Sequence, residues 1–398
     1  MASILSRFTL TFQPLEHSPS WNWPWTNRDP MFNFAVIHTI SWIDLAHDRI
    51  PTKERPLMRH LTLTLVLMVL ATTAMAQGTT ITGFADASYL YNTHDINGEF
   101  SLDQVEINII HQSSEKTLVR ADLEWIKDGE DMVAQVEQAF MTYTTNRGWG
   151  FTFGKFNAPI GFEEIDPVDM YQFSHSLVYE FGAPTNLTGA SIAKDFGPGF
   201  DIIGHVSNGW DRNTMAGANV TWGGRLGYSN GGFGGGFAAI SGKEDSIPEN
   251  EEDPAMPFTR TVYDIDLSFE TGMWLFGGEV NMGKVTQTME TGDVDQEWNG
   301  FLVMTHLDYA SWTGLTVRYD YFDDQDGYAF GGVMNGDELE YQKVQSITIC
   351  PTFNLDENFG ALVELRIDKS NRSGAFEDKD GEATDTNTTI AFEATYSW

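Results

Sequence analysis

Charged and apolar residues alternate along one short segment after another in this sequence. In residues 358–369, Leu365 and Ile367 fall on one face of a strand, whereas Glu364 and Arg366 fall on the other. The same pattern recurs in three further segments, 116–127, 260–271 and 314–323. Unpaired charges in a dry core would each cost several kcal/mol, and a water-filled interior removes that cost. The alternation therefore favours a closed barrel with lipid outside and water inside.

The strand pattern predicts an all-β fold: one transmembrane, antiparallel, up-and-down β-barrel of about sixteen strands. Short connections alternate with long ones, as expected when tight turns lie on one side of a membrane and loops on the other. Fourteen or eighteen strands are also compatible with the pattern, as is a soluble sheet with one wet face. The expected strands are 80–91, 100–112, 116–127, 133–145, 149–156, 188–195, 199–209, 217–229, 232–242, 260–271, 273–284, 299–312, 314–323, 342–354, 358–369 and 386–398.

The last strand ends the chain on Trp398, with Tyr396 two places earlier on the same face. Apolar and aromatic residues continue that face back to Ile390, and the opposite face is mostly small or polar. Such a strand is typical of a barrel with aromatic girdles. We expect it to be the segment that the barrel-assembly machinery recognises, and we expect outer-membrane lipid and lipopolysaccharide to surround the barrel.

The N-terminal region contains a secretory signal pattern. An apolar run, 61–70, follows the basic Arg59, and Ala74-Met75-Ala76 has the small residues that a signal peptidase cuts. We therefore expect residues 58–76 to be a signal peptide and 77–398 to be the barrel; an uncleaved anchor is the alternative. Residues 1–57 show no sustained period and are interpreted as a mis-called upstream extension.

The charge balance excludes one class of partner. The chain has 57 acidic and 23 basic residues, a net charge of −34, which repels the phosphates of nucleic acids. Cys350 is the single cysteine, so no internal disulfide can form.

One predicted outer loop, 157–187, is both long and rich in apolar residues. A loop of this length needs a reason, and its aromatic content suggests that it folds back and packs inside the barrel. The motif from Gly154 to Glu163, with Tyr171, Ser174, Leu177, Gly182-Ala-Pro184 and Thr188-Gly189, resembles the OmpL-like family of β-barrel porins. The resemblance implies a bacterial outer-membrane barrel that passes small solutes, without a defined substrate or catalytic residues.

The function that we predict is passive diffusion of small hydrophilic solutes or ions, with a preference for cations because carboxylates are in excess. We expect loop acids to face wall bases across the channel. The expected constriction residues are Phe162, Glu163, Glu164, Asp166, Asp169, Tyr171 and His175, and the expected pore-lining residues are Arg120, Asp122, Glu124, Asp264, Asp266, Arg318, Asp320, Glu364 and Arg366.

Three alternatives stay open at this point. A barrel closed by its loop would instead be a receptor, an adhesin or a structural anchor. Ser174-His175-Ser176 raises the possibility of a hydrolase, although neighbouring strand residues point apart and neither serine lies in the G-x-S-x-G motif of one hydrolase class. Acidic loops can recruit Ca²⁺ or Mg²⁺ that bridges to lipid phosphates. We predict a non-enzymatic protein with no cofactor and no metal site; porins of this size are often trimers, so a homotrimer is one open assembly.

Overall fold

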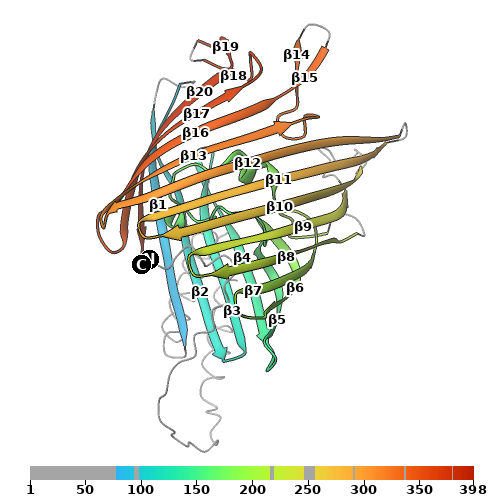
Figure 1. The fold of residues 1–398 in the computed structure, drawn as a ribbon, viewed down its shortest axis with the longest axis vertical. Coiled ribbons are helices and arrows are strands. Elements are labelled where there is room, and N and C mark those ends of the chain that lie inside the picture. The colour runs from blue at the N-terminus through green and yellow to red at the C-terminus, as the bar shows by residue number, and fades with distance from the viewer. Residues whose placement is uncertain are drawn as a thin grey trace, which may run out of the picture. The chain divides into compact units, whose positions relative to one another are not determined.

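Sixteen antiparallel strands close into one barrel in the part of the chain that the structure describes (Figure 1). The structure is a computed structural model that describes residues 78–93, 98–215, 219–245, 256–289, 292–335, 338–378 and 380–398. Each strand pairs with its neighbour in chain order, and the last strand pairs with the first, from Phe84 opposite Ser397 to Asn92 opposite Thr389. The predicted fold class and strand number are confirmed.

The barrel strands lie close to the predicted segments. They are β1 (Thr79–Asn92), β2 (Glu99–Ser114), β3 (Thr117–Asp128), β4 (Asp131–Thr144), β5 (Trp149–Asn157), β6 (Asn186–Asp195), β7 (Phe200–Ser207), β8 (Thr221–Asn230), β9 (Phe233–Asp245), β10 (Pro257–Thr271), β11 (Trp274–Met289), β12 (Gly292–Ala310), β13 (Thr313–Asp324), β16 (Lys343–Asn354), β17 (Phe359–Ser370) and β20 (Thr386–Ser397).

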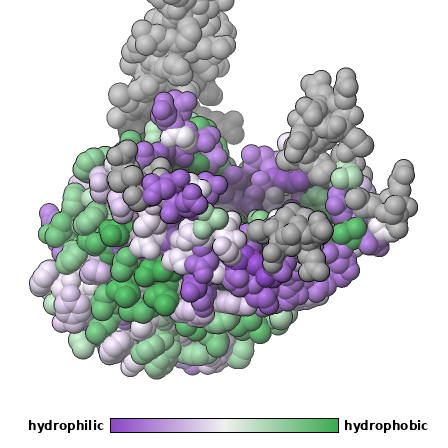
Figure 2. All heavy atoms as spheres, turned by 90° about the horizontal axis from the view of Figure 1, so that it is seen from above, coloured by the Kyte–Doolittle hydropathy of each residue, from purple (hydrophilic) through white to green (hydrophobic). Residues whose placement is uncertain are grey.

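The two faces of the wall differ in polarity. In β10 the side chains of Ile265 and Leu267 are about half exposed, whereas Asp264 and Asp266 between them are buried on the inner side. β13 and β17 follow the same rule, with apolar residues outward and charged residues inward. Figure 2 shows hydrophobic residues along the outer side of the barrel and hydrophilic ones at the rim of one end. This is the polarity expected of a barrel surrounded by lipid.

Two connections differ from the prediction. Residues 128–132 were expected to form a longer loop, but cross-strand pairing continues to Asp128 opposite Asp131. Gly129 and Glu130 alone make the turn, and the positive φ of Gly129, 63°, is a conformation that glycine adopts without strain. β11 and β12 also extend beyond the predicted ends, where Lys284 of β11 bonds to Asp295 of β12 at 2.6 Å.

The long connections contain elements that strand periodicity did not reveal. Two small hairpins, β14 (Gly332–Asn335) with β15 (Glu338–Tyr341) and β18 (Phe376–Glu377) with β19 (Ala383–Thr384), lie at the same end of the barrel (Figure 1). Between β5 and β6 the chain forms a 3-10 helix, η2 (Pro167–Asp169), and a short α-helix, α3 (Leu177–Gly182).

The predicted extension (1–57) and signal peptide (58–76) lie outside the described residues and stay predictions. Among the described residues, the helices are too short and too polar to cross a membrane.

Candidate functional site: a loop docked on the inner wall

Residues 158–185, which we call the inner loop, pack against the inner face of the barrel wall. The sequence sets the local structure of the loop: Ser176 caps α3 by accepting a hydrogen bond from the backbone N–H of Tyr179, and the helix ends before Ala183-Pro184. Ile160 and Leu177 of the loop are buried in one apolar cluster with Trp298 and Phe322 of the wall. The apolar residues of the loop therefore have partners inside the barrel, and their burial stabilises the docked position.

A glycine in β11 makes room for the ring of Phe162. Phe162 packs against a second small apolar cluster, formed by Leu275, Leu302 and Met304. A Cβ atom on Gly277 would lie 2.1 Å from Cζ of Phe162, so the ring occupies the space that a larger residue would fill. The wall is thus shaped to the loop at this point.

Wall carboxylates also accept hydrogen bonds from the backbone of the loop. Glu279 of β11 accepts from the N–H of Phe162 at 2.7 Å. Asp320 of β13 accepts from the N–H of Leu177 at 2.9 Å, and Glu364 of β17 accepts from the N–H of Ser174 at 3.0 Å. These bonds satisfy amide groups that the loop buries without secondary-structure partners.

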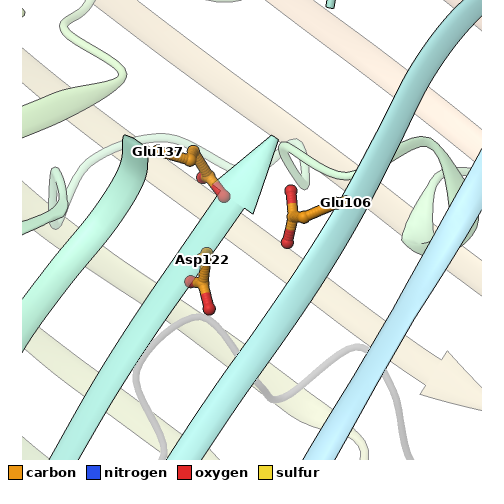
Figure 3. A group of neighbouring side chains, drawn as sticks. All are labelled: Glu106, Asp122 and Glu137. Atoms are coloured by element: carbon orange, nitrogen blue, oxygen red, sulfur yellow. The ribbon is translucent and has the colours of Figure 1, made fainter. Parts of the chain in front are cut away.

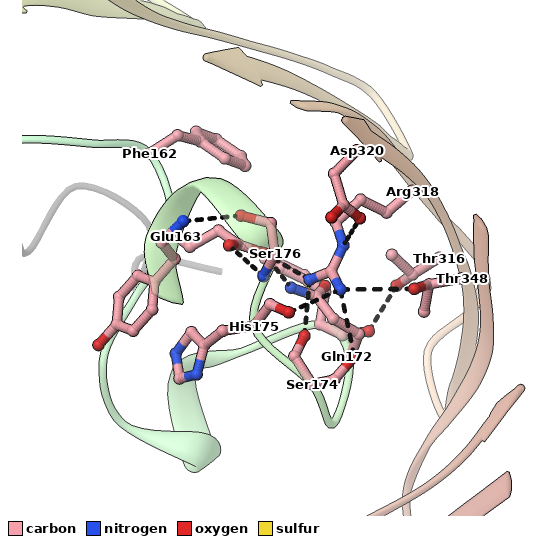
Figure 4. Close-up of polar contacts among 12 residues, drawn as sticks. Phe162, Glu163, Gln172, Ser174, His175, Ser176, Thr316, Arg318, Asp320 and Thr348 are labelled. Carbon is pink, nitrogen blue, oxygen red and sulfur yellow. Dashed lines mark hydrogen bonds and ion pairs between the residues drawn. The ribbon is translucent and has the colours of Figure 1, made fainter. Parts of the chain in front are cut away.

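Arg318 of β13 is the centre of the polar contact between wall and loop (Figure 4). Its Nη1 lies 2.6 Å from Oε1 of Glu163 and 2.6 Å from the carbonyl oxygen of Ser174. Its Nη2 donates to the carbonyl of His175 at 3.1 Å, and its Nε donates to Asp320 at 3.2 Å. The guanidinium is fully buried, so its charge depends on these partners.

Glu163 is held in its charged form. Its carboxylate accepts from the backbone N–H of Ser176 at 2.8 Å and from Gln172 at 2.9 Å, in addition to Arg318. Burial acts to raise the pKa of Glu163, but Arg318, with His175 and Ser176, outweighs burial and holds the pKa below its ordinary value.

A second arginine binds the same bend of the loop. Arg366 of β17 donates to Oγ of Ser174 at 3.0 Å and to the carbonyl of His175 at 2.5 Å. Its ion-pair partner is Asp368 on its own strand, 2.8 Å away. Arg366 therefore binds a hydroxyl and a backbone carbonyl of the loop rather than a loop carboxylate.

The acidic part of the loop lies in the field of Arg120. Burial, followed by repulsion from Asp169, raises the pKa of Asp166 to about 7, while Arg120 opposes the shift. Burial also raises the pKa of Asp169, and Arg120 again opposes it. Arg120 itself forms an ion pair with Asp122, two residues further along β3, at a distance of 2.8 Å.

The structure therefore corrects one expectation about the loop and the wall. Loop acids and wall bases were expected to face each other across open water, but Glu163 and Arg318 are in direct contact and buried. Asp320 and Glu364 face inward as expected, yet the loop covers them. These four residues hold the loop, so they do not meet a passing solute directly.

The other predicted residues have varied surroundings. Asp264 bonds to Asn281, Asp266 pairs with Arg225, and Glu124 bonds to Gln104 and Gln135, all along the inner wall. Tyr171 lies against His306 with ring centroids 4.4 Å apart, His175 stacks on Tyr179 at 3.7 Å, and the carbonyl of Glu164 is bound by His175.

Sequence reasoning missed two residues that help to position the loop, Glu279 and Gln172. It also missed Asn281, which bonds to Trp298 of the wall, although Glu279 and Asn281 share the inward period of β11. The pair Gly277-Gly278 in a strand was the available signal, because an interior glycine often marks a close approach.

Ser174 and Ser176, the serines that raised the possibility of a hydrolase, have other partners. Oγ of Ser174 accepts from both Arg318 and Arg366, and Oγ of Ser176 caps α3. In this arrangement both hydroxyls serve the docking of the loop.

Comparisons with known proteins agree with the architecture. A family model described as "Putative beta-barrel porin-2, OmpL-like" matches residues 78–398. A comparison with curated proteins finds no match.

Solved structures of other proteins, including an anion-selective porin, share the fold at low identity. An anion-selective porin from Comamonas acidovorans is 13% identical with a TM-score of 0.60, covering 80% of this chain and 99% of that one. The trimer form of in-vitro folded OmpT, an outer membrane protein of Vibrio cholerae, is 12% identical with a TM-score of 0.58 and coverages of 80% and 99%. OmpF of Salmonella typhi, in complex with daunomycin, is 10% identical with a TM-score of 0.57 and coverages of 81% and 99%. At these identities the likeness establishes the fold and leaves solute preference open.

Proposed function

This chain belongs to the OmpL-like β-barrel porin-2 family, and from that premise we propose that it lets small hydrophilic solutes and ions diffuse passively across the bacterial outer membrane, with a preference for cations. The family and the fold make it a porin-like outer-membrane barrel. One observation carries the finer proposal: a loop anchored to the inner wall at β11, β13 and β17 narrows the interior at a fixed place.

The cation preference is supported by the charges left near the docked loop. Arg318 is paired with Glu163 and Asp320, and Arg366 is paired with Asp368, so the charges of both arginines are largely compensated. Glu180 of α3 is exposed, and the ring of His175 lies 3.9 Å from its carboxylate. A net charge of −34 over the chain adds to a negative potential that attracts cations.

Recordings in a planar lipid bilayer test this proposal. The purified protein should give stepwise, voltage-independent conductance, and a KCl gradient should give a reversal potential of the sign for K⁺ preference. A reversal potential of the opposite sign would refute the cation preference but not the channel. A series of sugars of increasing size in the bath would then give the size limit.

A second candidate is a barrel closed by its loop, acting as a receptor, an adhesin or a structural anchor. The complete burial of Arg318, Asp320 and Glu364 under the loop favours it. The same recordings separate the two. A closed barrel gives no conductance steps until the loop is released, for example by Arg318→Met, whereas a porin gives steps already in the wild-type protein.

We further propose that the protein is not an enzyme and that its partners are the surrounding lipid and lipopolysaccharide, the assembly machinery that binds the strand ending at Trp398, and possible further copies of the chain in a homotrimer. Ser174→Ala and Ser176→Ala variants should leave any trace hydrolysis of esters or peptides unchanged. Light scattering in detergent measures the number of copies.

A further inference from the structure

A β-bulge in β4 brings an additional carboxylate to the inner wall. Asp122 of β3 lies opposite Gln138, but the next residue, Leu123, lies opposite Val136, so Glu137 is the extra residue. Glu137 and Gln138 are both buried, although they are adjacent, while Val136 is exposed on the outer face. Thr142 is buried on the inner side, and strict alternation back from it would turn Gln138 and Val136 inward and Glu137 toward lipid. Bulges of this kind re-aim a side chain, often at a functional site.

The redirected carboxylate joins two others. Figure 3 shows Glu106 of β2, Asp122 of β3 and Glu137 of β4 pointing toward one another. One oxygen atom of each lies within 4.8 Å of the others, and all three side chains are at least nine-tenths buried. Two oxygens on one Ca²⁺ ion, each about 2.4 Å from it, lie at most about 4.8 Å apart, and the three carboxylates meet this condition pair by pair.

Hydrogen bonding within the described part of the chain leaves this cluster incomplete. Neither carboxylate oxygen of Glu137 has a hydrogen-bond partner, and neither does Oε1 of Glu106. Oε2 of Glu106 accepts from Gln104 at 3.3 Å. Buried carboxylate oxygens without partners are costly and call for an ion or another donor.

One cation is present next to the cluster, and it serves mainly one member. Arg120 and Gln138 bind Asp122, at 2.9 and 2.8 Å. Glu124, the next inward residue of β3, adds negative charge and is bound by Gln104 and Gln135. The hydrogen bonds of Arg120 go to Asp122 and Asn108, and its attraction for Glu137 is smaller than the repulsion from Asp166, Asp122 and Glu124.

The inner loop adds a fourth carboxylate. Asp166 is close enough to repel both Glu106 and Glu137, and its buried Oδ1 has no hydrogen-bond partner among the described residues. Four carboxylates from three adjacent strands and one loop offer oxygen ligands only. That donor set suits a hard divalent cation, and Ca²⁺ accepts it with less demand on geometry than Mg²⁺.

We propose that Glu106, Asp122 and Glu137 form a binding site for one Ca²⁺ ion, and that the bound ion attracts the nearby carboxylate of Asp166 in the inner loop. The ion ties the acidic part of the loop to the wall at β2–β4, whereas Arg318 ties the other part at β13. This site does not depend on solute passage, since a plugged barrel and an open porin would bind the ion equally.

Calorimetric titration of Ca²⁺ into the chelator-treated, detergent-solubilised protein tests the site. We expect one saturable site in the wild type, with affinity reduced at least tenfold in Glu137→Gln and in Glu106→Gln, and weaker binding of Mg²⁺. Asp86→Asn is the matched control, because Asp86 is also a buried inward carboxylate with an unpartnered oxygen, on β1; its Ca²⁺ affinity should equal that of the wild type. Absence of saturable binding overturns the proposal. Equal binding in Glu137→Gln also overturns it, and points to ions on the acidic surface loops.

Thermal unfolding gives a second test, with a result that is not expected if Glu137 has only a structural role. In chelator, Glu137→Gln should unfold at a higher temperature than the wild type, because it removes like-charge repulsion. In Ca²⁺ the order should reverse, because only the wild type binds the ion in full. The same order in both conditions would contradict the site even if the variant folds normally.

Discussion

Nη1 of Arg318 on β13 lies 2.6 Å from Oε1 of Glu163, a residue 155 positions earlier in the chain, and both side chains are buried. Their contact joins the wall of the barrel to the loop inside it. Removing one partner of a buried, hydrogen-bonded ion pair leaves the other charge without compensation, which costs about 3–5 kcal/mol. The pair is therefore the point at which the position of the loop is most sensitive to substitution.

We predict that Arg318→Met releases the inner loop. Glu163, and the carbonyls of Ser174 and His175, would lose the guanidinium that holds them. Single-channel recordings should show a larger and noisier conductance, and a protease added to the solubilised protein should cut within 158–185. Arg372→Met is the matched control, because Arg372 pairs with Glu340 in a different connection. Wild-type conductance and protection in Arg318→Met would contradict this role.

We predict that the contact of Glu163 with Arg318 makes loop docking depend on pH in the acid range. The pKa of Glu163 is lowered from an ordinary value of 4.5, so the folded state favours its charged form. Its contribution to stability is complete above pH 4.5 and is lost as the pH falls through the lowered pKa. The rise in conductance noise that is due to Glu163 should thus occur below pH 4.5, separate from any change near pH 7, where Asp166 of the same loop titrates.

Glu163→Gln isolates this effect from other groups around Arg318. Asp320 and Glu364 also interact with Arg318, so the wild type alone cannot assign an acid transition to Glu163. In Glu163→Gln the noise should be raised at pH 7 and should change much less with acid. An acid transition of the same size in the variant would exclude Glu163 as its origin.

The sequence was informative about the wall because strand periodicity is a local property. β10, β13 and β17 each have charged residues on the inner face and apolar ones on the outer face, so their orientation follows from spacing alone. The direction in which Arg318 points could therefore be predicted. Its partners could not, because two of them are backbone carbonyls in a loop whose path no local pattern records.

The bulge in β4 marks a second limit. Strict alternation cannot place Glu137 and Gln138 on the same side of the sheet, yet the extra residue does so. A bulge is set by how two strands pair, and the sequence of one strand does not contain that information. The sequence therefore could not predict that the carboxylates of Glu106, Asp122 and Glu137 lie together, and only the folded structure shows it.

We predict that Gly277→Ala displaces Phe162. The added Cβ would meet the ring at 2.1 Å, and overpacking of this kind costs about 1–3 kcal/mol. Urea unfolding should show the loss. Adding Phe162→Ala should make the glycine substitution nearly neutral, because the clash is gone. Gly278→Ala is the control, since a Cβ there would have its nearest neighbour at 3.3 Å. Equal effects of Gly277→Ala with and without Phe162 would refute the contact.

We predict that Glu180→Gln weakens cation preference without releasing the loop. Glu180 is exposed on α3, and its contact with His175 is a long one, 3.9 Å. A unit charge at about 8 Å in water is worth roughly 0.5 kcal/mol, or about a twofold change in the cation-to-anion permeability ratio. Reversal potentials under a KCl gradient measure this ratio, and the mean conductance step should stay near that of the wild type. Exposed Glu357, in the turn between β16 and β17, provides the control, and Glu357→Gln should leave the ratio unchanged. If Glu180→Gln changes the noise as Arg318→Met does, the residue positions the loop instead of acting on ions.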